Sequence, residues 1–272
     1  MEKIRLDLYL TLKNYVSSRN KACQLIKANK IKVNGKPINK DSFLVQDTDT
    51  IEIIDEDNLK YVSRGGLKLE KALNSFKVLL DGLVVLDIGS STGGFTDCAL
   101  QNGAKKVYAL DVGTNQLAKS LKEDLRVISL ENTNFKDINH DLIQEKIDFY
   151  VCDVSFISIR TILLKLQEFD KDFTIIILYK PQFEVGKANI NKKGLVKSTK
   201  ILKDSLFDFL AFLKISNIGV LNYDYSPIKG NKQGNIEFLF LLKNQCASIK
   251  VDVDRLVDSA NNSLKGEKWL DN

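Results

Sequence analysis

The sequence predicts a two-domain α/β protein, in which a doubly wound parallel sheet follows a small N-terminal α+β unit. The chain has 272 residues, which is more than one average domain needs. From Gly65 onward, short apolar runs alternate with helix-length segments, the pattern of a parallel sheet with helices on both faces. The residues before Gly65 show a different pattern, so we expect two separate cores.

The N-terminal unit is expected to form two short helices and then a small β structure. The run RLDLYL has apolar residues at helical spacing, and Ser17 or Ser18 can cap a second helix that ends near Asn29. The run KIKVNGKPI contains Asn34-Gly35, the strongest two-residue hairpin signal, and TIEII adds another strand.

Charge is distributed unevenly over this unit. Residues 1–40 carry a net charge of +8, and residues 41–60 a net charge of −6. A dense basic segment can bind phosphates, although lysine-rich surfaces are also commonly just solvated. Residues 4–54 resemble the S-four-type RNA-binding domain, which implies that the second helix and the following strand face RNA. The residues that the resemblance implies for RNA binding are Arg19, Lys21, Lys27, Lys30 and Lys32, and we also expect Arg5 and, at the junction of the domains, Arg64 to take part.

The second unit is expected to contain five buried strands in sequence, and then a helix and two further strands. The strand runs are VVLDIGS, KVYALDVG, RVISLEN, KIDFYVCDV and FTIIILYK. A helix over about 201–214 precedes strands near 218–225 and 236–242. Ligands of such sheets bind outside the carboxyl ends of the strands, so the residues that close each run are the candidates for a site.

Composition excludes several classes of function. No run of about 18 apolar residues appears, and charged residues interrupt the first ten positions, so we expect neither a membrane span nor a secretory signal. The four cysteines are isolated, which indicates reduced thiols and no metal site. The single histidine, His140, lies in a polar stretch and is expected to be a solvated loop residue. Catalysis is therefore expected to use other residue types.

A glycine-rich turn after the first strand of the second unit predicts a nucleoside cofactor. Gly89-Ser90-Ser91-Thr92-Gly93-Gly94 matches neither the dinucleotide spacing nor the P-loop. Asp111 closes the next strand, where a carboxylate can bind two ribose hydroxyls or simply cap the strand end. S-adenosyl-L-methionine fits a nucleoside site without a pyrophosphate best. The expected cofactor-binding residues are Gly89, Ser90, Thr92, Gly93, Asp111, Val112, Asn134 and Asp153.

Further motifs connect this turn to a known family. Asp153 and Lys180 follow the fourth and fifth strands, Lys68 lies in SRGGLKL, and Glu237 lies in GNIE. With DIGSSTGGFTD and LDVGTNQL, these segments resemble the TlyA (haemolysin A) family of rRNA 2′-O-methyltransferases, whose catalytic domain is similar to FtsJ-like enzymes. The match extends over essentially the whole chain.

The resemblance implies a Rossmann-like S-adenosylmethionine-dependent methyltransferase with a catalytic tetrad of Lys68, Asp153, Lys180 and Glu237. A ribose 2′-hydroxyl is a poor nucleophile, so it must be aligned and must lose its proton. Lys180 either takes that proton or only orients the hydroxyl. The resemblance implies cytidine in ribosomal RNA as the target, ribosomal subunits as partners and no metal. We expect a cytoplasmic protein that is a monomer or a weak dimer.

We expect the RNA-binding domain over residues 1–59, a linker over 60–66, the methyltransferase domain over 67–250 and a helical tail over 251–272. Three alternatives to ribose methylation stay open. The first is methylation of a base nitrogen, although the D/N-P-P-Y/F motif of amine-directed enzymes is absent around Phe156. The others are a non-catalytic ribosome-binding factor and, from the haemolysin name, a membrane-active protein.

Overall fold

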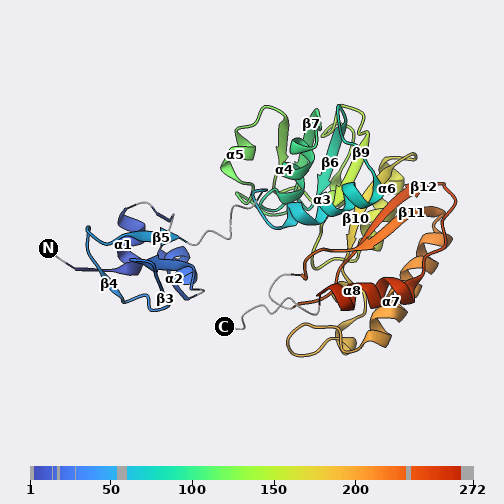
Figure 1. Ribbon diagram of the computed structural model, residues 1–272. Helices are drawn as coiled ribbons and strands as arrows, with labels where there is room; N and C mark the ends of the chain where they lie inside the picture. Colours follow the sequence, from blue (N-terminus) through green and yellow to red (C-terminus); the bar gives the residue numbers. More distant parts are fainter. Residues whose placement is uncertain are drawn as a thin grey trace. The chain divides into compact units, whose positions relative to one another are not determined.

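The computed structural model describes residues 3–13, 15–16, 19–27, 29–53, 60–230 and 234–264. The chain divides into two compact units, one formed by residues up to Leu59 and one that begins at Lys60 (Figure 1). Helix α3 starts at Gly65, inside the segment that we expected to be a linker. Of the expected tail, residues 251–252 are irregular, residues 253–264 form helix α8, and residues 265–272 lie outside the described residues.

The first unit is a small α+β structure around helices α1 and α2. Its elements are β1 (Ile4–Arg5), α1 (Leu6–Leu12), α2 (Arg19–Lys27), β2 (Ile31–Val33), β3 (Lys36–Ile38), β4 (Leu44–Val45) and β5 (Ile51–Ile53). Strand β2 lies between β3 and β5, and β1 pairs with β4, which the sequence did not predict. Asn34 and Gly35 have φ of 50° and 77°, as the primed turn of a two-residue hairpin requires. The expected hairpin is therefore confirmed.

The second unit is a seven-stranded sheet with the order β11-β12-β10-β9-β6-β7-β8. Its strands are β6 (Val84–Ile88), β7 (Lys106–Leu110), β8 (Val127–Leu130), β9 (Phe149–Cys152), β10 (Thr174–Tyr179), β11 (Ile218–Tyr225) and β12 (Phe238–Asn244). Strands β6 to β10 are parallel, and β12 is antiparallel to both of its neighbours. The chain runs outward from β6 through β7 to β8, and then returns to β9 on the other side of β6. This reversal is the switch point at which such sheets bind ligands.

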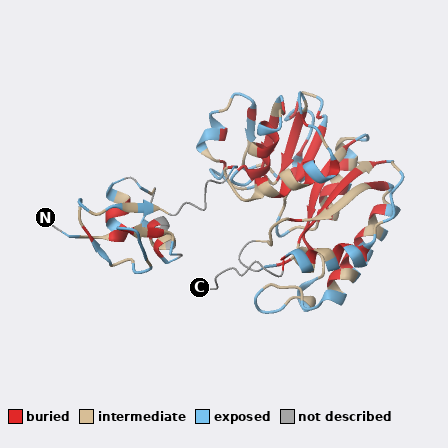
Figure 2. Cartoon of the chain, viewed as in Figure 1, coloured by how far each residue is buried: buried red, intermediate tan, exposed pale blue. Residues whose placement is uncertain are grey.

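Helices cover both faces of this sheet, and each face has its own core. One face holds α3 (Gly65–Phe76), α4 (Gly94–Gln101) and α5 (Lys119–Lys122), and the other holds α6 (Ile159–Phe169), α7 (Thr199–Ile215) and α8 (Val253–Leu264). Successive strand residues alternate between the cores, since Val85 packs with the first set and Leu86 with the second. The strands form the buried centre in Figure 2. The predicted doubly wound fold is confirmed.

The His140 ring is exposed and stacks on Phe169 with a centroid distance of 4.7 Å, as a loop residue can do. All four cysteines are free, and Cys98 and Cys152 are buried. Within the described residues, no helix is both long enough and apolar enough to span a bilayer.

Candidate active site

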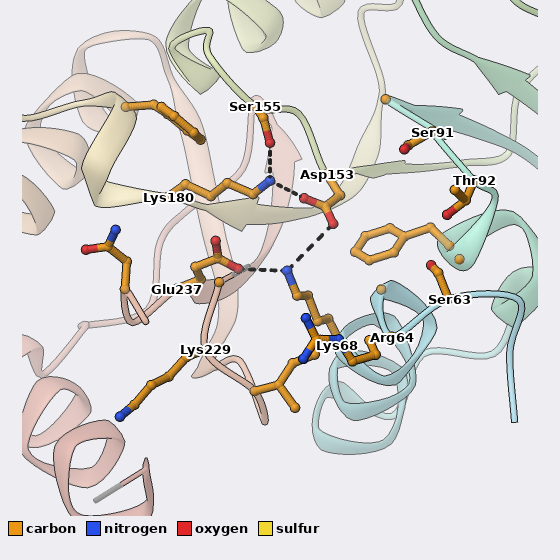
Figure 3. Close-up of a pocket in the computed structure, with 18 of the residues that line it drawn as sticks. Ser63, Arg64, Lys68, Ser91, Thr92, Asp153, Ser155, Lys180, Lys229 and Glu237 are labelled. Carbon is orange, nitrogen blue, oxygen red and sulfur yellow. Dashed lines mark hydrogen bonds and ion pairs between the residues drawn. The ribbon is translucent and has the colours of Figure 1, made fainter. Parts of the chain in front are cut away.

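A cavity of about 650 Å³ opens at the carboxyl ends of β6, β9 and β10. Lys68, Asp153, Lys180 and Glu237 all line it, and Figure 3 shows their polar groups pointing toward one another. They come from four different elements or the loops that follow them, far apart in the sequence. The second unit thus brings together the four residues of the tetrad that the family resemblance implied.

These four side chains form a continuous chain of alternating charges. The Lys180 ammonium lies 2.6 Å from Asp153 Oδ1, and the Lys68 ammonium lies 3.9 Å from Asp153 Oδ2. Lys68 also donates a hydrogen bond of 2.7 Å to Glu237 Oε2. Both lysine side chains are about nine-tenths buried, at 9% and 10% exposure, so solvent screens these pairs only weakly.

The electrostatics of the chain keep two of its members charged. Burial alone would lower the pKa of Lys68, but the Asp153 and Glu237 carboxylates outweigh it and raise that pKa above the ordinary value. Burial alone would raise the pKa of Asp153, but the Lys68 and Lys180 ammonium groups outweigh it and lower that pKa. Lys68 is therefore a fixed cation at neutral pH, and Asp153 is a fixed anion.

Neighbouring segments hold the loops that carry these residues. Glu184 accepts hydrogen bonds of 2.8 Å from Ser158 Oγ and from the Ile159 amide, which ties the start of α6 to the segment after β10. The Asn235 side chain donates to Gly194 O and accepts from the Val196 amide. These bonds fix the loop after Asp153 and the approach to Glu237. The positions of the charges are thus determined by several elements at once.

Ser155 and Phe156 follow Asp153 and belong to the site; the sequence drew attention to Phe156 only through the base-methylation alternative, and it gave no indication of Ser155. Ser155 Oγ accepts a hydrogen bond of 2.8 Å from Lys180 Nζ. Phe156 is 91% exposed and has a φ of 65°, a left-handed conformation that is strained for an aromatic residue. Its ring lies 5.0 Å from the ring of Phe183, and both rings line the cavity. A strained, exposed Phe156 beside a half-buried Phe183 at the cavity offers an aromatic surface for stacking.

The glycine-rich turn forms another wall of the cavity. Gly89, Ser90 and Thr92 line it, and Gly89 has a φ of 85°. A Cβ on Gly89 would lie 3.0 Å from the Asp153 carbonyl oxygen, so only glycine fits this turn without strain. Ser90 Oγ is buried and has no hydrogen-bond partner among the described residues. A close backbone turn and an unused hydroxyl are compatible with a polar cofactor held at this wall.

Asp87 lies in β6 shortly before the glycine-rich turn and connects it to helix α4. It is fully buried at the end of β6, and its Oδ2 accepts a hydrogen bond of 2.6 Å from Thr96 Oγ1. Burial, with a smaller contribution from the nearby Asp153 carboxylate, raises the pKa of Asp87 to about 7. The bond to Thr96 connects the end of β6 to helix α4, across the turn.

The remaining cofactor candidates lie outside the cavity lining. Asp111 accepts hydrogen bonds from the Ser91 amide at 2.8 Å and the Gly113 amide at 2.7 Å, so its carboxylate is anchored beside the glycine-rich turn. Val112 is 67% exposed. Asn134 caps a short 3₁₀ helix by accepting from the Lys136 amide. Gly93, with a φ of 96°, packs against Leu121 and Leu117. Of these four, only Asp111 presents a charged group next to the turn.

The RNA-binding candidates differ in whether their charged groups are paired with carboxylates. Arg5 and Arg19 both bond the buried Asp7 carboxylate, at 3.0 and 2.8 Å. Lys32 lies 3.8 Å from Glu52. Lys27 is exposed at the end of α2, Lys30 is half-buried just after it, and the Lys21 side chain lies outside the described residues. Arg64 belongs to the second unit, where it lines the cavity. The first unit thus presents its basic residues in partly neutralised form.

Comparison with known proteins identifies both units. Residues 61–244 match the model of the FtsJ-like methyltransferase family, and residues 4–51 match the S4 domain. Hemolysin A of Brachyspira hyodysenteriae is 45% identical over 240 residues, covering 87% of this chain and 98% of its own. The 16S/23S rRNA (cytidine-2′-O)-methyltransferase TlyA of Mycobacterium tuberculosis is 36% identical, covering 89% and 91%.

A solved structure agrees with these matches. The protein, from Streptococcus thermophilus and described as a hemolysin, superimposes with a TM-score of 0.76 at 38% identity, covering 97% of this chain and 98% of its own. Similarity at this level extends through both units. The chain therefore belongs to the TlyA (hemolysin A) family, with an FtsJ-like methyltransferase domain preceded by an S4 domain.

Proposed function

We propose that this protein transfers a methyl group from S-adenosyl-L-methionine to the 2′-hydroxyl of a cytidine in ribosomal RNA. The observation that carries the proposal is the charge chain of Lys180, Asp153, Lys68 and Glu237 at the cavity. The TlyA relative acts, by its name, on cytidines of 16S and 23S rRNA, and the S4 domain model supports an RNA substrate.

Lys180 is the residue that we propose contacts the reacting hydroxyl. An ammonium group has three hydrogens, and Lys180 directs two of its contacts to Asp153 and Ser155. Lys180 also lines the cavity, where the ammonium can orient the hydroxyl by donating a hydrogen bond, or the neutral amine can take the hydroxyl proton on its lone pair. Asp153 fixes the direction of Lys180. Lys68 and Glu237 in turn fix Asp153, since Lys68 bridges the two carboxylates.

Gly89, Ser90, Thr92 and Asp111 are the residues that we propose hold S-adenosyl-L-methionine. The cofactor supplies an electrophilic methyl group on a sulfonium. The backbone of Gly89 allows close approach, Ser90 offers an unused hydroxyl, and Asp111 offers a carboxylate for ribose hydroxyls. No charged side chain is needed to activate a sulfonium, so the residues act by positioning and by shielding.

The aromatic pair is proposed to stack on the target base. Phe156 and Phe183 line the cavity that also holds the charge chain. An enzyme that reaches one nucleotide of a folded RNA commonly extrudes it, and aromatic side chains stabilise the extruded base. Ribose methylation is favoured over base methylation because two lysines and two carboxylates suit a hydroxyl, and the proline motif of amine-directed enzymes is absent.

Mapping methylated riboses in ribosomal RNA tests the proposal directly. RNA from cells with and without the gene is hydrolysed in alkali, and protected linkages are located by sequencing, because a 2′-O-methyl group blocks cleavage. Loss of protection at one or more cytidines without the gene is the expected result. Unchanged protection, or a lost base methyl group instead, contradicts the proposal. Since ribosomal RNA is the proposed substrate, we place the protein in the cytoplasm.

Asp111→Ala is expected to raise the dissociation constant for S-adenosyl-L-methionine at least tenfold. Two ribose hydroxyls would lose a charged acceptor, and each such hydrogen bond contributes roughly 1.5–3 kcal/mol. Isothermal titration measures the constant directly. The dissociation constant of Asp111→Asn, which keeps one acceptor oxygen, is expected to lie between those of the parent protein and Asp111→Ala. Asp141→Ala, at an exposed position, serves as the control. Equal affinity in Asp111→Ala and the parent protein removes Asp111 from the site.

Lys27→Ala and Lys30→Ala are each expected to weaken binding to ribosomal subunits and to leave cofactor affinity unchanged. If each lysine contacts a phosphate, its loss reduces the slope of log affinity against log salt by about 1. Binding is measured across a salt series, with Lys146→Ala in the methyltransferase domain as the control. Slopes that stay unchanged in both variants contradict an RNA-binding role for the end of α2.

A further inference from the structure

Gln182 carries a hydrogen-bond acceptor that nothing in the described part of the chain uses. It lies in the 3₁₀ helix η2 (Pro181–Phe183), directly after Lys180, and it lines the cavity. Its Nε2 donates to Glu237 Oε1 at 3.2 Å. Its Oε1 is buried and has no partner among the described residues. A buried acceptor without a partner costs free energy, and a ligand in the cavity can recover that cost.

The contact with Glu237 determines which atom of the Gln182 amide is left without a hydrogen-bond partner. Glu237 accepts a hydrogen bond of 2.7 Å from Lys68, and a carboxylate in such a pair offers acceptors only. Turning the Gln182 amide over would set its oxygen against Glu237 Oε1, which is repulsive. The amide group therefore keeps its nitrogen on Glu237, and its oxygen is left without a partner among the described residues. The nearby Asn235 differs, because both ends of its amide are bonded.

The position of Gln182 relates it to the base of the bound nucleotide. On one side of it in sequence is Lys180, which we propose contacts the ribose hydroxyl, and on the other is Phe183 of the aromatic pair. All three line the same cavity. For a nucleoside with its ribose at Lys180 and its base against the aromatic pair, Gln182 is the cavity-lining residue that lies between these two contacts in sequence.

We infer that Gln182 Oε1 accepts a hydrogen bond from the exocyclic amine of cytosine, and that it distinguishes cytidine from uridine. The inference rests on the proposed function. Cytosine presents a donor at position 4, whereas uracil presents a carbonyl acceptor. Uridine would therefore set two acceptors against each other at a buried position, and the orientation imposed by Glu237 prevents the amide from adapting. Sites built around one hydrogen-bond partner reject analogues that lack it far more strongly than apolar pockets do.

The test compares three synthetic RNAs that span the mapped target position and carry cytidine, uridine or the pyrimidin-2-one ribonucleotide there. The last of these lacks only the exocyclic amine. For the parent protein, single-turnover methylation is expected to be at least tenfold slower with uridine and with pyrimidin-2-one. In Gln182→Leu, the rate on cytidine falls and the three rates converge. Gln144→Leu, the same exchange at an exposed position, keeps the parent discrimination.

Two outcomes overturn the inference, and a third outcome contradicts the proposed function instead. Equal rates of the parent protein on cytidine and pyrimidin-2-one overturn it without any variant, so the test does not depend on how Gln182→Leu folds. Undiminished discrimination in Gln182→Leu, with cofactor binding intact, also overturns it. If the parent protein methylates no ribose in any of the RNAs, the proposed function itself has failed.

Discussion

Lys180→Arg is expected to reduce single-turnover methylation of ribosomal RNA at least about 100-fold, which is the lower end of what positioned acid–base groups contribute. Arginine keeps the positive charge, but its guanidinium stays protonated and is planar and larger. It cannot take a proton from the hydroxyl. It also cannot reproduce the two short contacts, 2.6 Å to Asp153 and 2.8 Å to Ser155, from the same point. Affinity for RNA and for the cofactor should change little.

Lys68→Arg is the matched comparison for this experiment. Lys68 bridges Asp153 and Glu237 and, with its raised pKa, acts only as a cation. A guanidinium can also pair with two carboxylates, so a smaller decrease than in Lys180→Arg is expected. Titration with S-adenosyl-L-methionine confirms folding of both variants. Near-parental turnover in Lys180→Arg would place the catalytic centre elsewhere.

The sequence predicted the placement of the four charged residues better than it predicted their chemistry. Asp153 and Lys180 close two neighbouring parallel strands, and the carboxyl ends of such strands must meet at one edge of the sheet. Lys68 and Glu237 needed the family resemblance, because a helix position and a loop do not by themselves point to that edge. The 2.6 Å pair and the 2.7 Å bond depend on side-chain conformations that no spacing rule provides.

Residues whose roles depend on loop conformation were beyond prediction from the sequence. In the sequence, Ser155 is an ordinary small residue after a strand. Its hydroxyl contacts Lys180 because of the path that the loop takes, which the sequence does not show. The left-handed conformation of Phe156 leaves no sequence signal, because aromatic residues rarely adopt it. Gln182 lies two residues after Lys180, but its unused acceptor follows from a contact with Glu237, which lies 55 positions further along the chain.

Asp153→Asn is expected to abolish most of the activity, with a decrease of at least about 100-fold, since it removes the one anion between two buried cations. Asparagine has nearly the same shape, so packing is retained while the pairing is lost. Lys68 keeps Glu237 as a partner, whereas Lys180 keeps the neutral Ser155 hydroxyl and, 6.0 Å away, the Phe183 ring. Lys180 then loses the charge that directs it toward the substrate.

Glu237→Gln separates the role of this anion from a general requirement for carboxylates at the site. In that variant Lys68 still has Asp153 and Lys180 is untouched, so a smaller decrease than in Asp153→Asn is expected. Single-turnover rates at saturating cofactor and RNA measure both variants under the same conditions. If Asp153→Asn retained more activity than Glu237→Gln, the direct contact between Asp153 and Lys180 could not be what orients the reacting lysine, and the order of roles along the charge chain would have to be reversed.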